Sequence, residues 1–124
     1  MKIKPRDILY INHYLATLQN APRGVADESM LKAALLRPSS TFSGESLYPD
    51  PCSRAGALAE FLIKGRPFLS CHHSTAIACG LYLLHQEGLR FSLTDQDLDA
   101  LGPLLYEEDL LTALSAWFSS LAYN

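Results

Sequence analysis

The stretch HSTAIACGLYLLHQE, residues 73–87, decides the fold class. Its apolar residues fall on almost every side of a helix, and they are Ala76, Ile77, Ala78, Leu81, Leu83 and Leu84. A helix with this pattern is buried at the centre of a globular protein, because no side of it is polar enough to face water. Gly88 is expected to end this helix. The sequence therefore predicts a central buried helix over residues 73–87.

Five further helices are predicted from apolar residues that recur at three- and four-residue steps. They are expected at about residues 5–19, 28–37, 53–64, 95–101 and 106–122. Asp27 and Thr94 are placed to cap the second and fifth helices of the chain. Pro38 is expected to end the second helix, because a proline disfavours helical geometry in the residue before it. Gly65 is expected to end the third helix, and the pair Gly102-Pro103 is expected to end the fifth. The sum is an all-α fold of six helices in one domain, residues 1–124.

The charge is unevenly distributed along the chain. Residues 1–62 carry seven Lys or Arg and six Asp or Glu, whereas residues 63–124 carry three and seven. Three acids, Glu107, Glu108 and Asp109, are expected in the first turn of the last helix, where negative charge is favourable. A face that binds nucleic acid needs clustered Lys and Arg, so the acidic C-terminal third excludes that class of partner. We interpret the acidic surface as solvated, with docking of a basic partner as the alternative.

Composition and cysteine usage indicate where the protein works. A chain of 124 residues with 48% apolar and 19% charged residues is typical of one globular domain. No apolar run approaches the ~20 residues of a membrane span, and the N-terminus lacks the apolar core of a signal peptide. Three cysteines, Cys52, Cys71 and Cys79, cannot all pair, which indicates a reducing compartment. We therefore expect a soluble, cytoplasmic protein with no membrane partner.

Residues 38–51 break the helical pattern with three prolines and one glycine. They are expected to form a long loop or a small β flap, and loops of this length are often functional. Phe42, Gly44 and Tyr48 are its candidate functional residues. We expect Phe42 and Tyr48 to pin the flap to the core, and the alternative is that they are exposed contacts for a partner.

The segment DESMLKAALLRPSSTFSGESLYP, residues 27–49, resembles the flap region of death-on-curing proteins, the Doc branch of the Fic superfamily. A pattern of LxxALxRP, then FGGE, then YP is typical there. The helix at 55–64, the turn at 66–74 and the segment LYLLHQEG at 81–88 continue the resemblance in order, so that it covers about residues 5–120. It implies an all-α fold and relatives that use ATP-type nucleotides to modify proteins. It also implies an antitoxin-like protein partner that inhibits them.

The catalytic turn of that family usually reads HPFxDGNKRTA, and RPFLSCHHSTA, residues 66–76, occupies its register. The matching residues are Pro67, Phe68, Thr75 and Ala76. Arg66 stands at the position of the family's base, and a guanidinium stays protonated above pH 12, so it cannot accept a proton at pH 7. Ser70 stands at the position of the Mg²⁺-binding Asp, and a neutral hydroxyl is a poor ligand for that cation.

The other chemical positions of the turn differ as well. Cys71 replaces a glycine, and a left-handed conformation at this position costs a cysteine energy. His72, His73 and Ser74 replace residues that bind phosphate. The candidate anion- or nucleotide-binding residues are therefore Arg66, Ser70, Cys71, His72, His73 and Ser74, and none of the family's catalytic residues is intact. The resemblance implies an ATP-type nucleotide with Mg²⁺ as the cofactor, and the replacements weigh against it.

Three functions remain open from the sequence. The leading interpretation is a Doc/Fic-fold protein related to toxin–antitoxin toxins, inactive as an enzyme and regulatory or interacting in role. The alternative is a nucleotide- or phosphoryl-transferring enzyme with a rearranged site, using His72 or His73 as base. The third is a helical domain that retains no ligand. Zinc binding by the Cys71-His72-His73 region and a nucleophilic Cys71 are further alternatives, whereas Cys79 is expected to be an inert buried thiol and His13 a surface or half-buried side chain.

Overall fold

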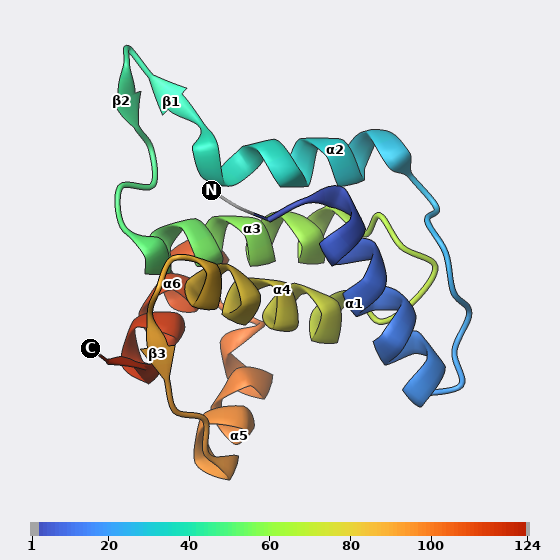
Figure 1. Ribbon diagram of the computed structural model, residues 1–124. Coiled ribbons are helices and arrows are strands. Elements are labelled where there is room, and N and C mark those ends of the chain that lie inside the picture. Colours follow the sequence, from blue (N-terminus) through green and yellow to red (C-terminus); the bar gives the residue numbers. More distant parts are fainter. Residues whose placement is uncertain (1–2, 124) are drawn as a thin grey trace.

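The computed structural model describes residues 3–123, which form six α-helices and two short pairs of antiparallel strands (Figure 1). The helices are α1 (Pro5–Leu18), α2 (Glu28–Leu36), α3 (Pro51–Gly65), α4 (His72–Gln86), α5 (Asp95–Leu104) and α6 (Leu110–Leu121). The strands are β1 (Thr41–Phe42), β2 (Glu45–Ser46), β3 (Arg90–Phe91) and β4 (Ala122–Tyr123). The all-α prediction is confirmed at this level, and among residues 3–123 no helix has both the length and the apolar character needed to cross a membrane.

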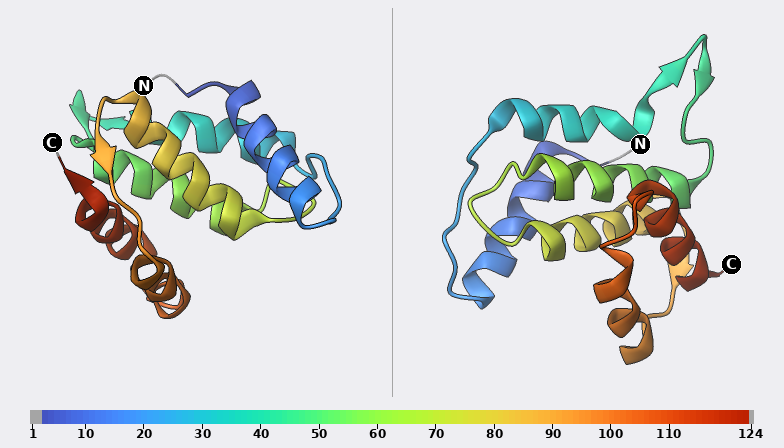
Figure 2. Two further views of the ribbon diagram at one scale, coloured as in Figure 1. Left: turned by 60° about the horizontal axis from the view of Figure 1, so that its bottom comes forward. Right: turned by 180° about the vertical axis from the view of Figure 1, so that it is seen from behind.

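Helices α3 and α4 form the centre of the molecule, with α2 over α3, α1 across α4, and α6 against α3 (Figures 1 and 2). The predicted burial of the helix at 73–87 is confirmed, since Ala76, Cys79, Leu83 and Leu84 are fully buried in it. Two glycines allow α6 to come close. A Cβ atom on Gly80 would lie 2.3 Å from Cζ of Phe118, and one on Gly56 would lie 2.2 Å from Oγ of Ser115.

The boundaries of α5 and α6 differ most from the prediction, whereas α3 begins two residues and α4 one residue earlier than expected. Helix α5 continues through Gly102-Pro103 to Leu104, so the expectation that this pair ends the helix is wrong. Pro103 lies in the last turn of a helix without buried residues, where the one carbonyl that loses its donor can bond to water instead. Helix α6 begins at Leu110, and the Asp109 carboxylate accepts a hydrogen bond from the Thr112 N–H at 3.1 Å. Asp109 is therefore the N-cap, and the expected first-turn placement of the three acids is wrong.

The flap prediction is confirmed in its β form. Strands β1 and β2 pair antiparallel, and the two residues between them, Ser43 and Gly44, have φ of 52° and 82°, as a type I′ hairpin turn requires. The hairpin projects away from the helices (Figure 1). Phe42 is 72% exposed, so the expectation that it pins the flap is wrong, because no other element within residues 3–123 covers this two-stranded hairpin. Tyr48 is 6% exposed, and its expected pinning role is confirmed.

Strands β3 and β4 were not predicted from the sequence, and neither was the ion pair between Arg54 and Glu87 at the end of the flap. The strand pair joins Arg90 to Tyr123 and is too short to produce a pattern. Arg54, in the first turn of α3, donates from Nε to Glu87 Oε2 at 2.7 Å and from Nη1 to the Tyr48 carbonyl at 2.9 Å. This arginine therefore joins the end of the flap to the end of α4.

Candidate functional site

The turn between α3 and α4 is held in an unusual backbone conformation at both of its ends. Arg66 follows the last residue of α3 with φ 48° and ψ 56°, and its N–H donates to the Leu62 carbonyl at 3.2 Å. Cys71 precedes α4 with φ 61° and ψ 39°. Both lie in the left-handed region, where a non-glycine residue costs about 1–3 kcal/mol. The cost expected for Cys71 is therefore present, and contacts outside the turn must hold it in place.

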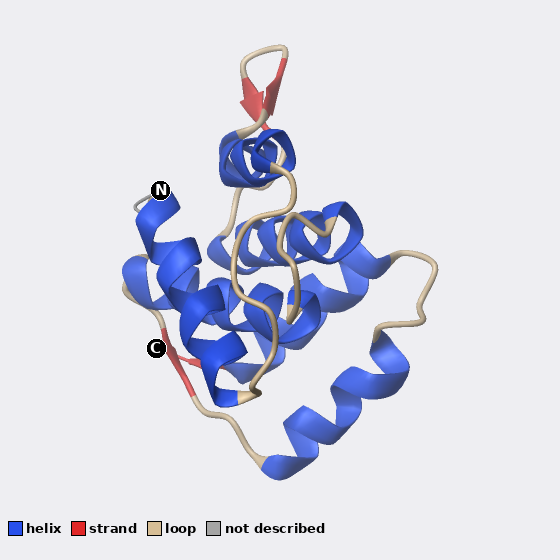
Figure 3. Ribbon diagram, turned by 90° about the vertical axis from the view of Figure 1, so that its right-hand side faces the viewer, coloured by secondary structure: helices blue, strands red, loops and turns tan. Residues whose placement is uncertain are grey.

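The chain between α1 and α2 supplies part of that support. Residues 22–27 run beside the turn (Figure 3). The Leu69 N–H donates to the Gly24 carbonyl at 3.0 Å, and the Ser70 hydroxyl donates to the Pro22 carbonyl at 2.6 Å. Gly24 has φ 128°, which an L side chain rarely adopts, so the close approach of these two segments depends on glycine there. Ser70 thus has a structural role in the turn.

Asn12 also supports the turn between α3 and α4, and its role was not predicted from the sequence. Its side chain comes from α1 and is 3% exposed. The Nδ2 group donates to the Ser70 carbonyl at 3.0 Å and to the Thr75 hydroxyl at 3.0 Å. It therefore ties the turn to the first turns of α4. The only sequence signal is a polar residue on the apolar side of a predicted helix.

The turn encloses a cavity of about 400 Å³, which we call the cup. Its lining residues are Gln19, Arg66, Leu69, Ser70, Cys71, His72, His73 and Ser74. All six loop residues singled out from the sequence are therefore brought together. Gln19, from the end of α1, was not predicted; its side chain lies 3.5 Å from the Ser74 hydroxyl oxygen. Of the described residues that line the cup, none is Asp or Glu.

The two neighbouring histidines of the cup have different surroundings. The His72 side chain is buried, and its Nε2 lies 2.8 Å from the Phe68 carbonyl oxygen and 3.2 Å from the Phe68 nitrogen. In either neutral tautomer, this nitrogen is therefore engaged by the backbone of the turn. Burial lowers the pKa of His72, and the positive charge of Arg66 acts in the same direction, although the hydrogen bond to Phe68 opposes them. The lowered pKa favours the neutral imidazole, and His72 braces the turn through its contacts with Phe68.

His73 and Arg66 are the exposed ionisable side chains of the cup. The first-turn N–H groups of α4 have no acceptors within the helix, and a helix N-terminus carries partial positive charge. A guanidinium and such N–H groups can hold an anion. They do not supply a base, so proton abstraction in the cup would depend on the His73 imidazole.

Cys79 and Cys71 differ in their burial. Cys79 is fully buried, so its predicted burial is confirmed, and burial raises the pKa of its thiol. Cys71 is half-buried, and its Sγ lies 3.5 Å from the Ser70 hydroxyl oxygen. Within residues 3–123 there is no group of three or more His, Cys, Asp or Glu side chains arranged to hold a metal ion.

An apolar groove of about 310 Å³ adjoins the cup between α4 and α5. It shares His73 and Ser74 with the cup, and its other lining residues are Ile77, Ala78, Leu81, Leu93, Leu98, Leu101 and Leu105. The exposed imidazole of His73 therefore stands where a polar and an apolar surface meet.

The flap residues take no part in the cup. Phe42, Gly44 and Tyr48 belong to the segment that leads into the first residue of α3, whereas the cup begins after its last residue (Figures 1 and 2). The hairpin and the cup thus lie at opposite ends of α3. Comparison of the chain with protein-family models, with curated proteins and with solved structures finds no match.

Proposed function

We propose that this protein is a non-catalytic member of the Fic/Doc group, related to toxin–antitoxin toxins, that acts by binding a protein partner. The observation that carries the proposal is the state of the cup. A turn and helix start are present at the positions that the resemblance assigns to catalysis, and yet Arg66 stands at the position of the base. The Nε2 atom of His72 is occupied by the Phe68 backbone.

The chemistry of transfer explains why this observation matters. Moving a nucleotide or a phosphate onto a hydroxyl needs a proton acceptor with a pKa near the working pH, and acid–base help is worth ~10²–10⁴-fold in rate. Arg66 cannot accept a proton at neutral pH. Mg²⁺ prefers carboxylate oxygens, and none of the described residues lining the cup carries one.

The hairpin supports the binding role. Phe42 projects into solvent at 72% exposure, and Leu47 at the foot of the hairpin is 49% exposed. Because the hairpin projects from the helices, these two apolar side chains are accessible to a protein partner. The partner that the resemblance implies is an antitoxin-like protein.

A second candidate is a transferase with a rearranged site, and the exposure of His73 in the cup favours it. This candidate depends on His73, because His72 is engaged by the turn. The two functions differ in a single observable, which is transfer of label from ATP.

The test is incubation of the protein with labelled ATP, Mg²⁺ and a cell lysate. We expect no transfer by the wild type or by Arg66→His, because restoring the base alone leaves Ser70 and Cys71 at the metal and glycine positions. Labelling that is reproducible and abolished by His73→Ala would refute the proposal and support the transferase.

A thermal-shift titration with ATP, ADP and AMP, with and without Mg²⁺, asks separately whether the cup binds a nucleotide. A ligand at ~100 times its dissociation constant adds about 2.7 kcal/mol to the free energy of unfolding. We expect flat titrations at millimolar ligand, and sulfate serves as the control for simple anion binding.

Partner binding is tested with Phe42→Ser. Tyr106→Ser is the matched control, because Tyr106 is 90% exposed in the segment before α6 and lies outside the hairpin. A partner captured by the wild type and by Tyr106→Ser should be lost with Phe42→Ser. Equal capture by all three proteins would exclude the hairpin as the contact site.

A further inference from the structure

Arg37, which follows α2, is held by aromatic rings and not by an acid. Its guanidinium carbon lies 5.6 Å from the centre of the Tyr48 ring and 5.7 Å from the centre of the Phe61 ring. Its Nε atom is buried, and among residues 3–123 it has no hydrogen-bond partner. The ion pairs described join other residues, namely Arg54 to Glu87 and Lys64 to Glu60. An unpaired buried donor on a charged group is costly and calls for an acceptor.

This arginine lines a cavity of about 270 Å³ between α2 and the C-terminal half of α3. The other lining residues are Met30, Glu60, Phe61, Lys64 and Gly65. Gly65 leaves room for the side chain of Met30, because a Cβ atom there would lie 2.5 Å from Met30 Cγ. The cavity thus joins an apolar wall to a cation, and it shares no lining residue with the cup.

The charges of the cavity favour an anion. Arg37 and Lys64 are cationic, and the single acid, Glu60, lies with Oε2 3.3 Å from the Lys64 Nζ. Glu60 is therefore neutralised by its helix neighbour, which leaves the Arg37 guanidinium without a counter-ion.

We propose that the cavity binds a small carboxylate carried on an apolar or aromatic body. The planar fork of a guanidinium matches a carboxylate and pairs with it through two hydrogen bonds. A carboxylate can approach the side of a guanidinium and accept hydrogen bonds from Nε and one Nη. Because Nε is buried, this pairing requires the guanidinium to turn toward the cavity, and the carboxylate would then supply the acceptor that Nε lacks. Met30 and Phe61 would contact the body of the ligand. Liquid water fills ~30 Å³ per molecule, so the volume is room for roughly nine waters, or for one ring of the size of benzoate.

The test compares three probes by NMR titration of the amide and Arg Nε–H signals of the wild type. Benzoate carries both a carboxylate and an apolar ring. Benzamide has the same shape without the charge, and inorganic phosphate has charge without an apolar body. We expect saturable shifts at the cavity residues with benzoate, and affinity at least about tenfold weaker for benzamide and for phosphate. Equal affinity for benzoate and either of the other probes, or no saturable shift with benzoate, would overturn the proposal.

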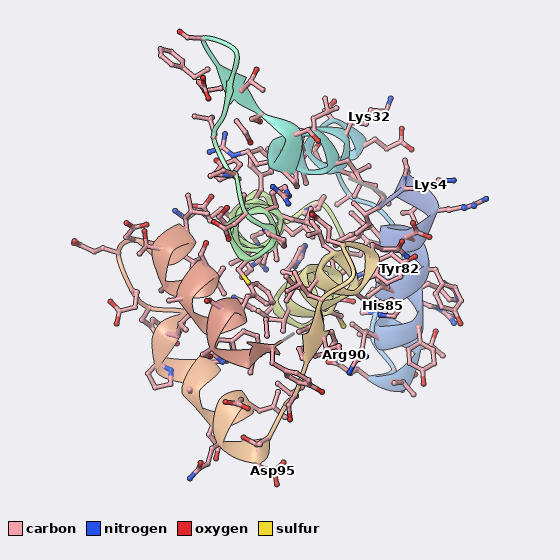
Figure 4. The ribbon with its side chains drawn as sticks, turned by 60° about the vertical axis from the view of Figure 1, so that its left-hand side comes forward. Lys4, Lys32, Tyr82, His85, Arg90 and Asp95 are labelled. Carbon is pink, nitrogen blue, oxygen red and sulfur yellow. The ribbon has the colours of Figure 1, made fainter. Side chains whose placement is uncertain are left out.

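Variants locate the site. Arg37→Gln should weaken benzoate binding at least about tenfold. Lys32→Gln is the matched control, because Lys32 projects outward from α2, the helix before Arg37 (Figure 4), and does not line the cavity. Arg37→Gln also removes both ring contacts, so Lys64→Gln provides a second variant that keeps them and should weaken binding a few-fold. If Arg37→Gln folds and its affinity for benzoate is unchanged, the proposed site is wrong. If Arg37→Gln does not fold, an unchanged benzoate affinity in Lys64→Gln would contradict the site instead.

Discussion

Replacement of Asn12 by leucine tests whether the cup is held from outside the turn. The leucine has a similar size, but it removes the hydrogen bonds to the Ser70 carbonyl and the Thr75 hydroxyl, both 3.0 Å long. Loss of the bond to the Ser70 carbonyl costs about 1 kcal/mol, whereas a buried polar group left without its partner costs ~1–3 kcal/mol in total. Thr75 is fully buried, so the penalty applies to its hydroxyl. We expect the free energy of unfolding to fall by about 2–4 kcal/mol.

Urea denaturation followed by Trp117 fluorescence measures this loss, and thermal melting should show a fall of roughly 8–16 °C at about 4 °C per kcal/mol. Hydrogen exchange at the Thr75 amide, which donates to the Cys71 carbonyl at 3.0 Å, reports the turn itself and should become faster. His13→Ala, at the exposed neighbouring position of α1, is the control and should change the stability by less than about 0.5 kcal/mol. An Asn12→Leu protein as stable as this control, with unchanged Thr75 exchange, would refute the reasoning.

Three other expectations concern the interior. Gly80→Ala should lower the free energy of unfolding measured in urea. Overpacking against the Phe118 ring costs ~1–3 kcal/mol, which outweighs the gain of about 1 kcal/mol in helix propensity. A stabilised variant would show that α4 and α6 are farther apart. Because the pKa of His72 is lower in the folded protein than in the unfolded chain, the unfolded chain takes up its proton first, so stability should fall as the pH drops from 7 to 5. His72→Gln should reduce that fall, and an unchanged pH dependence would contradict the assignment. Cys79, buried with a raised pKa, should react with a thiol reagent only at the rate of unfolding, and fast labelling in the native protein would disprove its burial.

The helices could be predicted because their signals are local. The stretch at 73–87 is apolar on almost every side, and that alone places α4 in the centre. The start of α6 was harder to predict, because Asp109 suits either the N-cap or the first turn, and both positions bring a carboxylate near the same N–H groups. The choice depends on which residue packs first into the core, and that residue is Leu110.

The site shows the same division between local and tertiary information. The loop residues at 66–74 could be grouped from the sequence, since neighbours in one turn must lie together. The burial of His72 and the exposure of His73 could not be predicted. Successive residues of a helix point about 100° apart, and the start of α4 was predicted one residue too late. Asn12 lies 58 residues from Ser70 and 63 from Thr75, so nothing local connects them.

The exposure of Phe42 had the same cause. An aromatic residue in a flap is buried only where another element covers the flap, and the position of that element is not encoded near residue 42. Tyr48 differs because Arg37, which follows α2, lies over its ring and also over the ring of Phe61 from α3.

The placement of the hairpin and the cup at opposite ends of α3 has a steric consequence. A helix of 15 residues is about 22 Å long, which exceeds the reach of one side chain or one tight loop. A small molecule bound at Phe42 would therefore leave the mouth of the cup open, and one seated in the cup would leave the hairpin free, whereas a protein partner is wide enough to reach both places. Two small ligands at these places would therefore not exclude one another sterically.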